Sequence, residues 1–164
     1  MNMTHYMQLL ATNQPWNLIF YMAIPVVLAE TLVATEFFVV YKRLTGGTLR
    51  VFNKLIGIVL GVYFLGVFIN LMVGVVPHIQ WLGWIDVVAV GFYLSGVIPL
   101  VGIALLEVGI LGRGLTNDGK MRLHFILLTV FLVVAHVAMV FGMLDPTLTM
   151  GTGVETGHGH NMKM

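Results

Sequence analysis

The sequence contains no cysteine, and only 9% of its 164 residues are charged. Without cysteine the chain has no disulfide, no thiolate zinc site, no iron–sulfur cluster and no thiol nucleophile. Soluble domains carry about a quarter charged residues, so a chain with this few cannot cover a water-exposed surface. The formal net charge of +1 also provides no basic face for nucleic acid. These shortages exclude a soluble domain and a nucleic-acid-binding protein.

Common catalytic motifs are missing as well. The sequence has no G-x-S-x-G nucleophile motif, no phosphate-binding loop and no dinucleotide-binding glycine motif. The only serine in the apolar segments is Ser95. An enzyme is therefore not the expected class of protein.

Apolar residues are abundant instead, at 59% of the chain. A membrane-spanning helix needs about 20 mostly apolar residues, and four such runs are separated by short polar segments. The predicted spans are 16–41, 51–76, 84–112 and 121–144. Because the connections are short, successive helices are expected to run antiparallel. The sequence thus predicts an all-α integral membrane protein, an antiparallel four-helix transmembrane bundle over residues 16–144, with an outer N-terminal segment 1–15 and a flexible outer tail 145–164.

The basic residues predict the orientation of this bundle, because Lys and Arg near span ends are retained in the cytoplasm. Seven of the eight flank the first and third connections: Lys42, Arg43, Arg50, Lys54, Arg113, Lys120 and Arg122. Both termini are then expected on the outer, periplasmic side of a bacterial inner membrane. The three tryptophans fall on the same side, where indole rings favour the interface: Trp16, Trp81 and Trp84.

Small residues and prolines inside the spans predict close packing and bends. Two pairs of small residues are four positions apart: Gly57 with Gly61, and Gly91 with Ser95. Pro25 and Pro99 each remove a backbone hydrogen bond from a span and are expected to bend it.

Ionisable residues inside the spans are candidates for function, since each costs about 3 kcal/mol or more in hydrocarbon. Glu36, Glu107 and His124 lie at similar depth on three spans. Such a set suits a divalent cation or the passage of protons. The alternatives are a hydrogen-bonded structural cluster, or side chains that extend to the nearby cytoplasmic interface.

Glu30 lies deeper, close to the membrane midplane, and cannot reach the interface easily. It is within one or two helical turns of the level of Tyr63, Ser95 and His136. We interpret these residues as a second polar layer, in which Glu30 lines a cavity or relay.

The fourth span carries a stripe of soft ligands. His136, Met139 and Met143 follow i, i+3, i+7 spacing and so share one helix face. Met22 and Met72 lie in the outer halves of their spans. Thioether sulfur with imidazole suits Cu(I), although methionine is also an ordinary filler of helix cores.

Both terminal segments alternate Met or His with other residues. The ligands are Met3, His5 and Met7 at the N-terminus, and His158, His160, Met162 and Met164 at the C-terminus. In an extended segment this spacing places the ligands on one side, where a soft ion can collect several of them. The alternative is two disordered tails of accidental composition.

The leading interpretation is a small multi-pass membrane protein that binds a soft metal ion, copper, on its outer face and transports or delivers it. The tails would capture the ion, the span-four stripe would pass it inward, and an intramembrane polar relay would lie below: Glu30, Glu36, Glu107 and His124. Besides the lipid bilayer, the expected partners are further copies of the chain or a larger membrane complex.

Two alternatives remain. In a b-type haem cytochrome, His124 and His136 would ligate haems at two depths, about 18 Å apart along the helix. Each iron would then need a second ligand, supplied by the same helix of another subunit. In the other alternative, the protein is a non-catalytic accessory subunit whose polar residues only pack helices.

Overall fold

The computed structural model describes residues 4–43, 46–81 and 83–145, and within these ranges the chain is helical with no strand. Four helical segments are long and apolar enough to cross a membrane: Trp16–Tyr41, Thr48–His78, Trp84–Val108 and Asn117–Met143. The prediction of four apolar helices of membrane-spanning length is confirmed, and every predicted boundary lies within four residues of the observed one.

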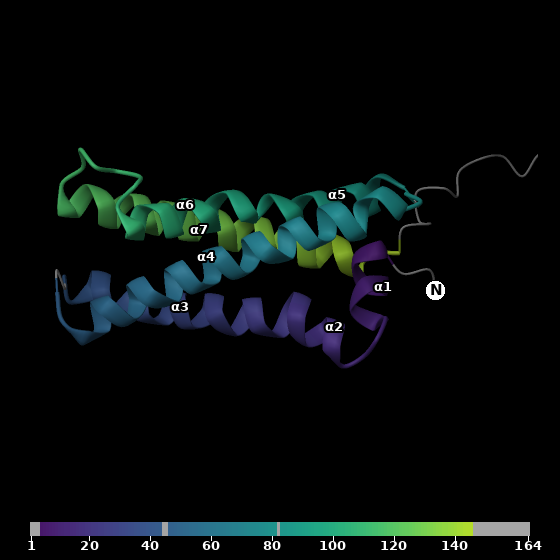
Figure 1. The fold of residues 1–164 in the computed structure, drawn as a ribbon, viewed down its shortest axis with the longest axis horizontal. Coiled ribbons are helices and arrows are strands. Elements are labelled where there is room, and N and C mark those ends of the chain that lie inside the picture. The colour runs from purple at the N-terminus through teal and green to yellow at the C-terminus, as the bar shows by residue number, and fades with distance from the viewer. Residues whose placement is uncertain (1–3, 44–45, 82, 146–164) are drawn as a thin grey trace, which may run out of the picture.

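Three of the four segments are composite (Figure 1). The first joins α2 (Trp16–Leu18), the π-helical turn Ile19–Ala23 and α3 (Ile24–Tyr41). The second joins α4 (Thr48–Gly74) and the 3₁₀ turn Val76–His78. The third joins α5 (Trp84–Ser95) and α6 (Val97–Val108), and the fourth is the single helix α7 (Asn117–Met143). A short helix precedes them: α1 (His5–Ala11).

The two spans that contain Pro25 and Pro99 are interrupted beside these prolines. The π-helical turn Ile19–Ala23 lies just before Pro25. The third span is broken at Gly96, and Pro99 follows in the first turn of α6. Proline lacks the N–H that would bond the carbonyl four residues earlier, which for Pro25 is the carbonyl of Tyr21. Each proline expected to bend its span thus lies beside an interruption of the helix.

The helices pack unevenly. α4 packs against α3 and α6, and α7 packs against α5 and α6, whereas α3 and α7 touch at few positions. The connection from α3 to α4 and that from α6 to α7 lie at one end of the molecule, while α1 lies at the other (Figure 1). The seam between α3 and α7 is therefore the open edge of the bundle.

Glycine allows the closest helix contact. A Cβ on Gly61 would stand 2.6 Å from the Cβ of Ala104 and 2.6 Å from the carbonyl oxygen of Leu100, so α4 and α6 can approach this closely only with glycine there. The predicted packing role of Gly61 is confirmed. Gly91 has no atom within 4 Å of its ideal Cβ, so the expected packing role of the second small pair is wrong within this chain.

The N-terminal segment differs from its prediction. Residues His5–Ala11 form α1 rather than an extended segment, so His5 and Met7 do not share one side as the alternation suggested. Thr4 caps the helix by accepting the Met7 N–H, and its hydroxyl donates to the carbonyl oxygen of Gly142 at 2.7 Å. Capping and docking onto α7 stabilise a helix that the ligand spacing did not predict.

Candidate functional site

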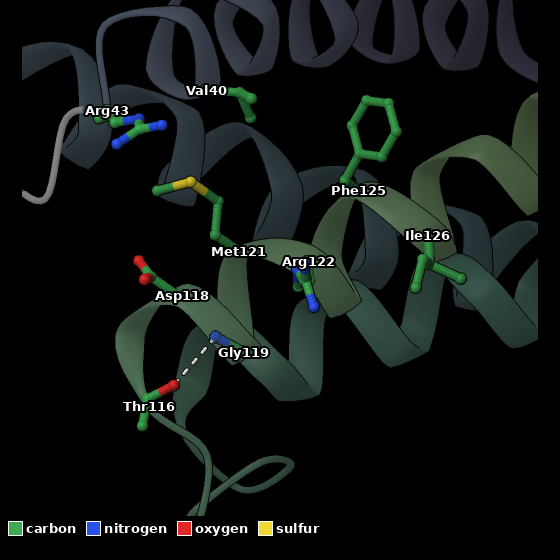
Figure 2. A pocket seen from close by; sticks show the side chains of 9 residues that line it. All are labelled: Val40, Arg43, Thr116, Asp118, Gly119, Met121, Arg122, Phe125 and Ile126. Carbon is green, nitrogen blue, oxygen red and sulfur yellow. Dashed lines mark hydrogen bonds between the residues drawn. The ribbon is translucent and has the colours of Figure 1, made fainter.

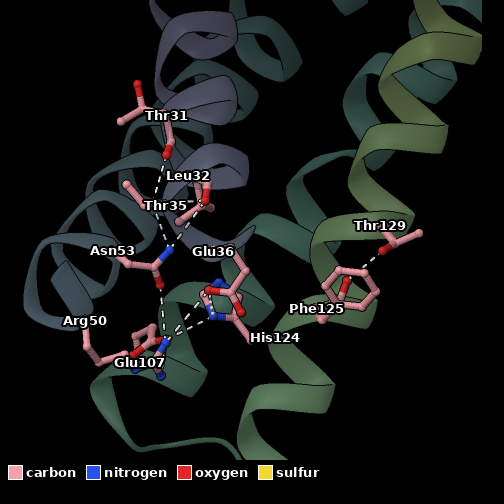
Figure 3. A network of polar contacts seen from close by, with 10 residues as sticks. All are labelled: Thr31, Leu32, Thr35, Glu36, Arg50, Asn53, Glu107, His124, Phe125 and Thr129. Carbon is pink, nitrogen blue, oxygen red and sulfur yellow. Dashed lines mark hydrogen bonds and ion pairs between the residues drawn. The ribbon is translucent and has the colours of Figure 1, made fainter. Parts of the chain in front are cut away.

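A buried polar cluster lies near the end of the bundle that holds the α3–α4 and α6–α7 connections (Figure 3). The Nδ1 atom of His124 is 3.2 Å from Oε1 of Glu107 and 3.5 Å from Oε2 of Glu36. His124 is 0% exposed and Glu36 1% exposed. The structure thus brings together three residues that the sequence placed at one depth on α3, α6 and α7.

Arg50 joins them from α4 (Figure 3). Its Nη2 donates to Oε1 of Glu107 at 3.0 Å, and its Nη1 lies 3.9 Å from Oε2 of Glu36. We call Glu36, Arg50, Glu107 and His124 the inner cluster. From the sequence, Arg50 was expected only to mark the cytoplasmic side of the membrane, although its position in the first turn of α4 places it close enough to reach inward.

Asn53 supports the inner cluster through a hydrogen bond with Arg50. It lies three residues after Arg50, on the same face of α4, and is fully buried. Its side-chain carbonyl accepts from Arg50 at 3.3 Å, while its amide donates to the hydroxyl of Thr35 at 3.0 Å and to the carbonyl of Leu32 at 3.4 Å. This residue was also missed, because an uncharged amide near a span end gives little signal in sequence.

Hydrogen bonding in the cluster is incomplete. Among the described residues, both carboxylate oxygens of Glu36 and both ring nitrogens of His124 are buried without a well-aligned hydrogen bond. The contacts between them are ion-pair distances rather than aligned hydrogen bonds. Buried polar atoms are usually hydrogen-bonded, so this end of the bundle holds polar groups whose burial is costly.

Two hollows flank this end. A cavity of about 250 Å³, which we call the basic cavity, is lined by Arg50, Lys54, Lys120 and Glu107. A wider open hollow of about 980 Å³ lies beside the seam, where Figure 2 shows Val40 and Arg43 facing the first turns of α7. Glu107 thus contacts both the basic cavity and His124.

A second candidate site lies in the half of the bundle nearer α1. A cavity of about 240 Å³ opens at the α3–α7 seam, and we call it the seam cavity. Besides tyrosines, the side chains with ligand chemistry in its lining come from two segments far apart in sequence: Met22 and Glu30 on the first span, and His136 and Met139 on α7. The predicted depths place only Glu30 and His136 near one level, and the cavity joins them to Met22 and Met139.

His136 is prepared to act as a ligand. Its Nδ1 lies 2.6 Å from the carbonyl oxygen of Leu132. A carbonyl only accepts, so Nδ1 carries the proton, and Nε2 of the neutral ring keeps a free lone pair. Metal-binding histidines commonly have such a hydrogen bond on the other ring nitrogen.

Other predicted residues lie outside the seam cavity. Met143 is 63% exposed and Met72 is 41% exposed, and neither lines it. Tyr63 and Ser95, expected in the polar layer with Glu30, instead donate their hydroxyls to the backbone carbonyls of Phe20 and Phe92. The remaining predicted ligands lie outside the described residues: Met3, His158, His160, Met162 and Met164.

The α1 end carries a contact that the sequence analysis missed. The backbone N–H of His5 donates to Oδ1 of Asp86 at 2.7 Å, and its Nδ1 lies 2.6 Å from Oδ2. Asp86 is fully buried and fixes α1 to α5. Tyr6 then lines the seam cavity, and burial raises the pKa of this phenol to about 12, so it stays neutral at physiological pH.

The described ranges contain no group of three or more His, Asp or Glu side chains arranged to hold a metal ion. A metal in the seam cavity would therefore depend on methionine sulfur together with His136.

Four apolar helices of spanning length, with ionisable residues between them, mark the chain as a polytopic helical membrane protein. It belongs to a family of unknown function, DUF6803, whose model matches residues 1–158. Comparison with curated proteins and with solved structures gave no match.

Proposed function

We propose that this membrane protein binds copper as Cu(I) in the seam cavity and transports or delivers it. The observation that carries the proposal is the lining of one cavity by His136, Met139 and Met22. Neutral imidazole and thioether sulfur are the ligands that Cu(I) favours. The free Nε2 of His136 supplies the nitrogen.

Glu30 completes the charge balance of this site. Imidazole and thioether ligands are neutral, so a bound Cu(I) would leave one positive charge in a low-dielectric region. The Glu30 carboxylate lines the same cavity and offsets that charge. This role explains an acidic residue far from either end of its span.

We propose that the seam cavity lies in the outer half of the membrane, with both termini outside. The basic residues flank the connections at the opposite end, and cytoplasmic retention of positive charge supports this orientation. All three tryptophans are about half exposed, as expected for an interfacial belt: Trp16 at 58%, Trp81 at 46% and Trp84 at 55%. The Met and His residues of the C-terminal segment would capture the ion before it enters.

A second copy of the chain, or a partner subunit, fits the open seam. The cavity opens between α3 and α7, where these helices barely touch. A copy placed against the seam would cover Glu30 and His136 and separate the ion from lipid.

The haem alternative has less support. His124 is fully buried and lies within 3.5 Å of two carboxylates, which leaves its ring little room beside a porphyrin. His136 would then be the one intramembrane ligand from each chain. An intense Soret band in the purified protein would favour haem over copper.

Competition titration of Cu(I) against a chromophoric chelator tests the proposal. The wild-type chain should bind Cu(I) stoichiometrically, and His136→Ala or Met139→Ala should weaken binding about tenfold or more. Matched controls are His78→Ala and Met72→Ala, which remove the same chemistry from exposed positions outside the cavity. Equal affinity in all four variants would overturn the seam-cavity site, and absence of both metal and haem would favour the accessory-subunit interpretation.

A further inference from the structure

The inner cluster has an unbalanced charge. Glu36 and Glu107 contribute two negative charges, Arg50 contributes one positive charge, and a neutral His124 contributes none. One negative charge then remains in a cluster whose glutamates and histidine are almost fully buried, while Arg50 is 21% exposed. An uncompensated buried charge costs several kcal/mol. Lys54 and Lys120 line the basic cavity on the Glu107 side, so the charge that still needs a counterpart is that of Glu36, which is 1% exposed.

A metal ion is a poor candidate for that counterpart. The Arg50 guanidinium lies 3.0 Å from the oxygen of Glu107 and 3.9 Å from that of Glu36, where it repels any cation these oxygens would bind. The described part of the chain also holds no His, Asp and Glu group arranged for metal. A proton needs no coordination sphere and fits between oxygen and nitrogen atoms that already lie close together.

We propose that the inner cluster is a binding site for one exchangeable proton. Nδ1 of His124 lies within 3.5 Å of both carboxylates, so one proton can reside on the imidazole or on Glu36. Both carboxylate oxygens of Glu36 and both ring nitrogens of His124 are buried without an aligned hydrogen bond, and a proton held at these atoms would supply a donor between them. With the proton bound, the four side chains sum to zero charge.

Glu107 provides the route by which this proton exchanges. It lines the basic cavity, and its Oε1 is 3.2 Å from Nδ1 of His124. A proton entering from the cavity passes from Glu107 to His124 and then to Glu36, which is 3.5 Å further on. The charged groups around the site come from every span: Glu36 on α3, Arg50 and Lys54 on α4, Glu107 on α6, and His124 and Lys120 on α7.

The positive lining of the basic cavity disfavours metal cations. Lys54, Lys120 and Arg50 repel metal cations from the cavity that leads to Glu107. A proton can still move along water and carboxylate positions. The site is separate from the seam cavity, since Glu30 and Glu36 are six residues apart on α3, about 9 Å along the axis.

The charge of the inner cluster predicts that some variants lose the bound proton and others gain a second one. The full chain in detergent would be examined at neutral pH by ¹⁵N NMR, which reports an imidazolium at His124, and by infrared spectroscopy, which reports a protonated carboxyl group. The summed signal should equal one proton in the wild type. Glu36→Gln removes the excess negative charge and should abolish the proton signal. Arg50→Gln adds one uncompensated negative charge and should raise the signal to two protons.

Two further variants keep the test decisive if Arg50→Gln does not fold. Arg50→Lys retains the positive charge and should keep one bound proton. Lys120→Gln alters only the lining of the basic cavity and should also keep one bound proton. The wild-type signal should also exchange with deuterium from D₂O. The proposal would be overturned if the wild type lacked the proton, if Glu36→Gln retained it, or if the signal did not exchange. Unchanged Cu(I) affinity in Glu36→Gln would show that the inner cluster and the seam cavity are distinct sites.

Discussion

The hydroxyl of Tyr93 donates a hydrogen bond of 2.7 Å to the backbone carbonyl of Tyr21. That carbonyl lies four residues before Pro25, which has no N–H to offer it. The hydroxyl of Tyr63 donates to the neighbouring backbone carbonyl, that of Phe20, at 2.9 Å. Unsatisfied carbonyls are costly in a bilayer, so the two tyrosines allow a π-helical turn to form one wall of the seam cavity.

Replacing Tyr93 by Phe should destabilise the protein by about 1 kcal/mol, because the Tyr21 carbonyl loses its donor. Thermal unfolding in detergent, followed by circular dichroism, measures the change. Tyr41→Phe is the control, since that side chain is 76% exposed. Equal midpoints for the two variants would show that the carbonyl does not depend on Tyr93.

Gly61→Ala should separate α4 from α6 and lower stability by about 1–3 kcal/mol, because its Cβ would stand 2.6 Å from Ala104 and from the Leu100 carbonyl. Gly66→Ala is a matched control on the same helix, with no atom within 4 Å of its ideal Cβ. The thermal midpoint should fall for the first variant only. A fall of equal size in both would contradict this account of helix packing.

Asp86→Asn should loosen α1, because the His5 N–H and ring lose a charged acceptor, a contact worth about 1.5–3 kcal/mol. Hydrogen–deuterium exchange of the α1 amides should quicken while that of α4 stays unchanged. Gly142→Ala should act in the same way, since its Cβ would stand 2.8 Å from the Tyr6 ring. Asp118→Asn, at the exposed start of α7, should leave α1 protected.

Replacing the four C-terminal ligands, His158, His160, Met162 and Met164, by Ala should slow Cu(I) uptake by the intact protein. The seam cavity should keep its own affinity, because the tail serves capture rather than final binding. Stopped-flow mixing with a Cu(I)–chelator complex separates the rate from the equilibrium. Unchanged uptake would remove the tail from the proposed function, and a lost equilibrium affinity would relocate the binding site to the tail.

Depth along the spans could be predicted because an α-helix rises about 1.5 Å per residue. Counting turns placed Glu36, Glu107 and His124 at one level, and the structure places a carboxylate oxygen of each glutamate within 3.5 Å of Nδ1 of His124. Arg50 was missed because a basic residue at a span end is usually read as a marker of sidedness. Asp86 was missed because its partner is the backbone of α1, a helix that the alternating ligands did not predict.

The sequence by itself determined the number, length and depth of the apolar helices, since hydrocarbon thickness imposes these on any chain that spans a bilayer. Only the tertiary structure decided which faces meet. In lipid, apolar faces do not select one another by burial, so close packing at Gly61 and hydrogen bonds across helices fix the arrangement. That arrangement joins Met22, Glu30, His136 and Met139 in one cavity and leaves it open at the α3–α7 seam.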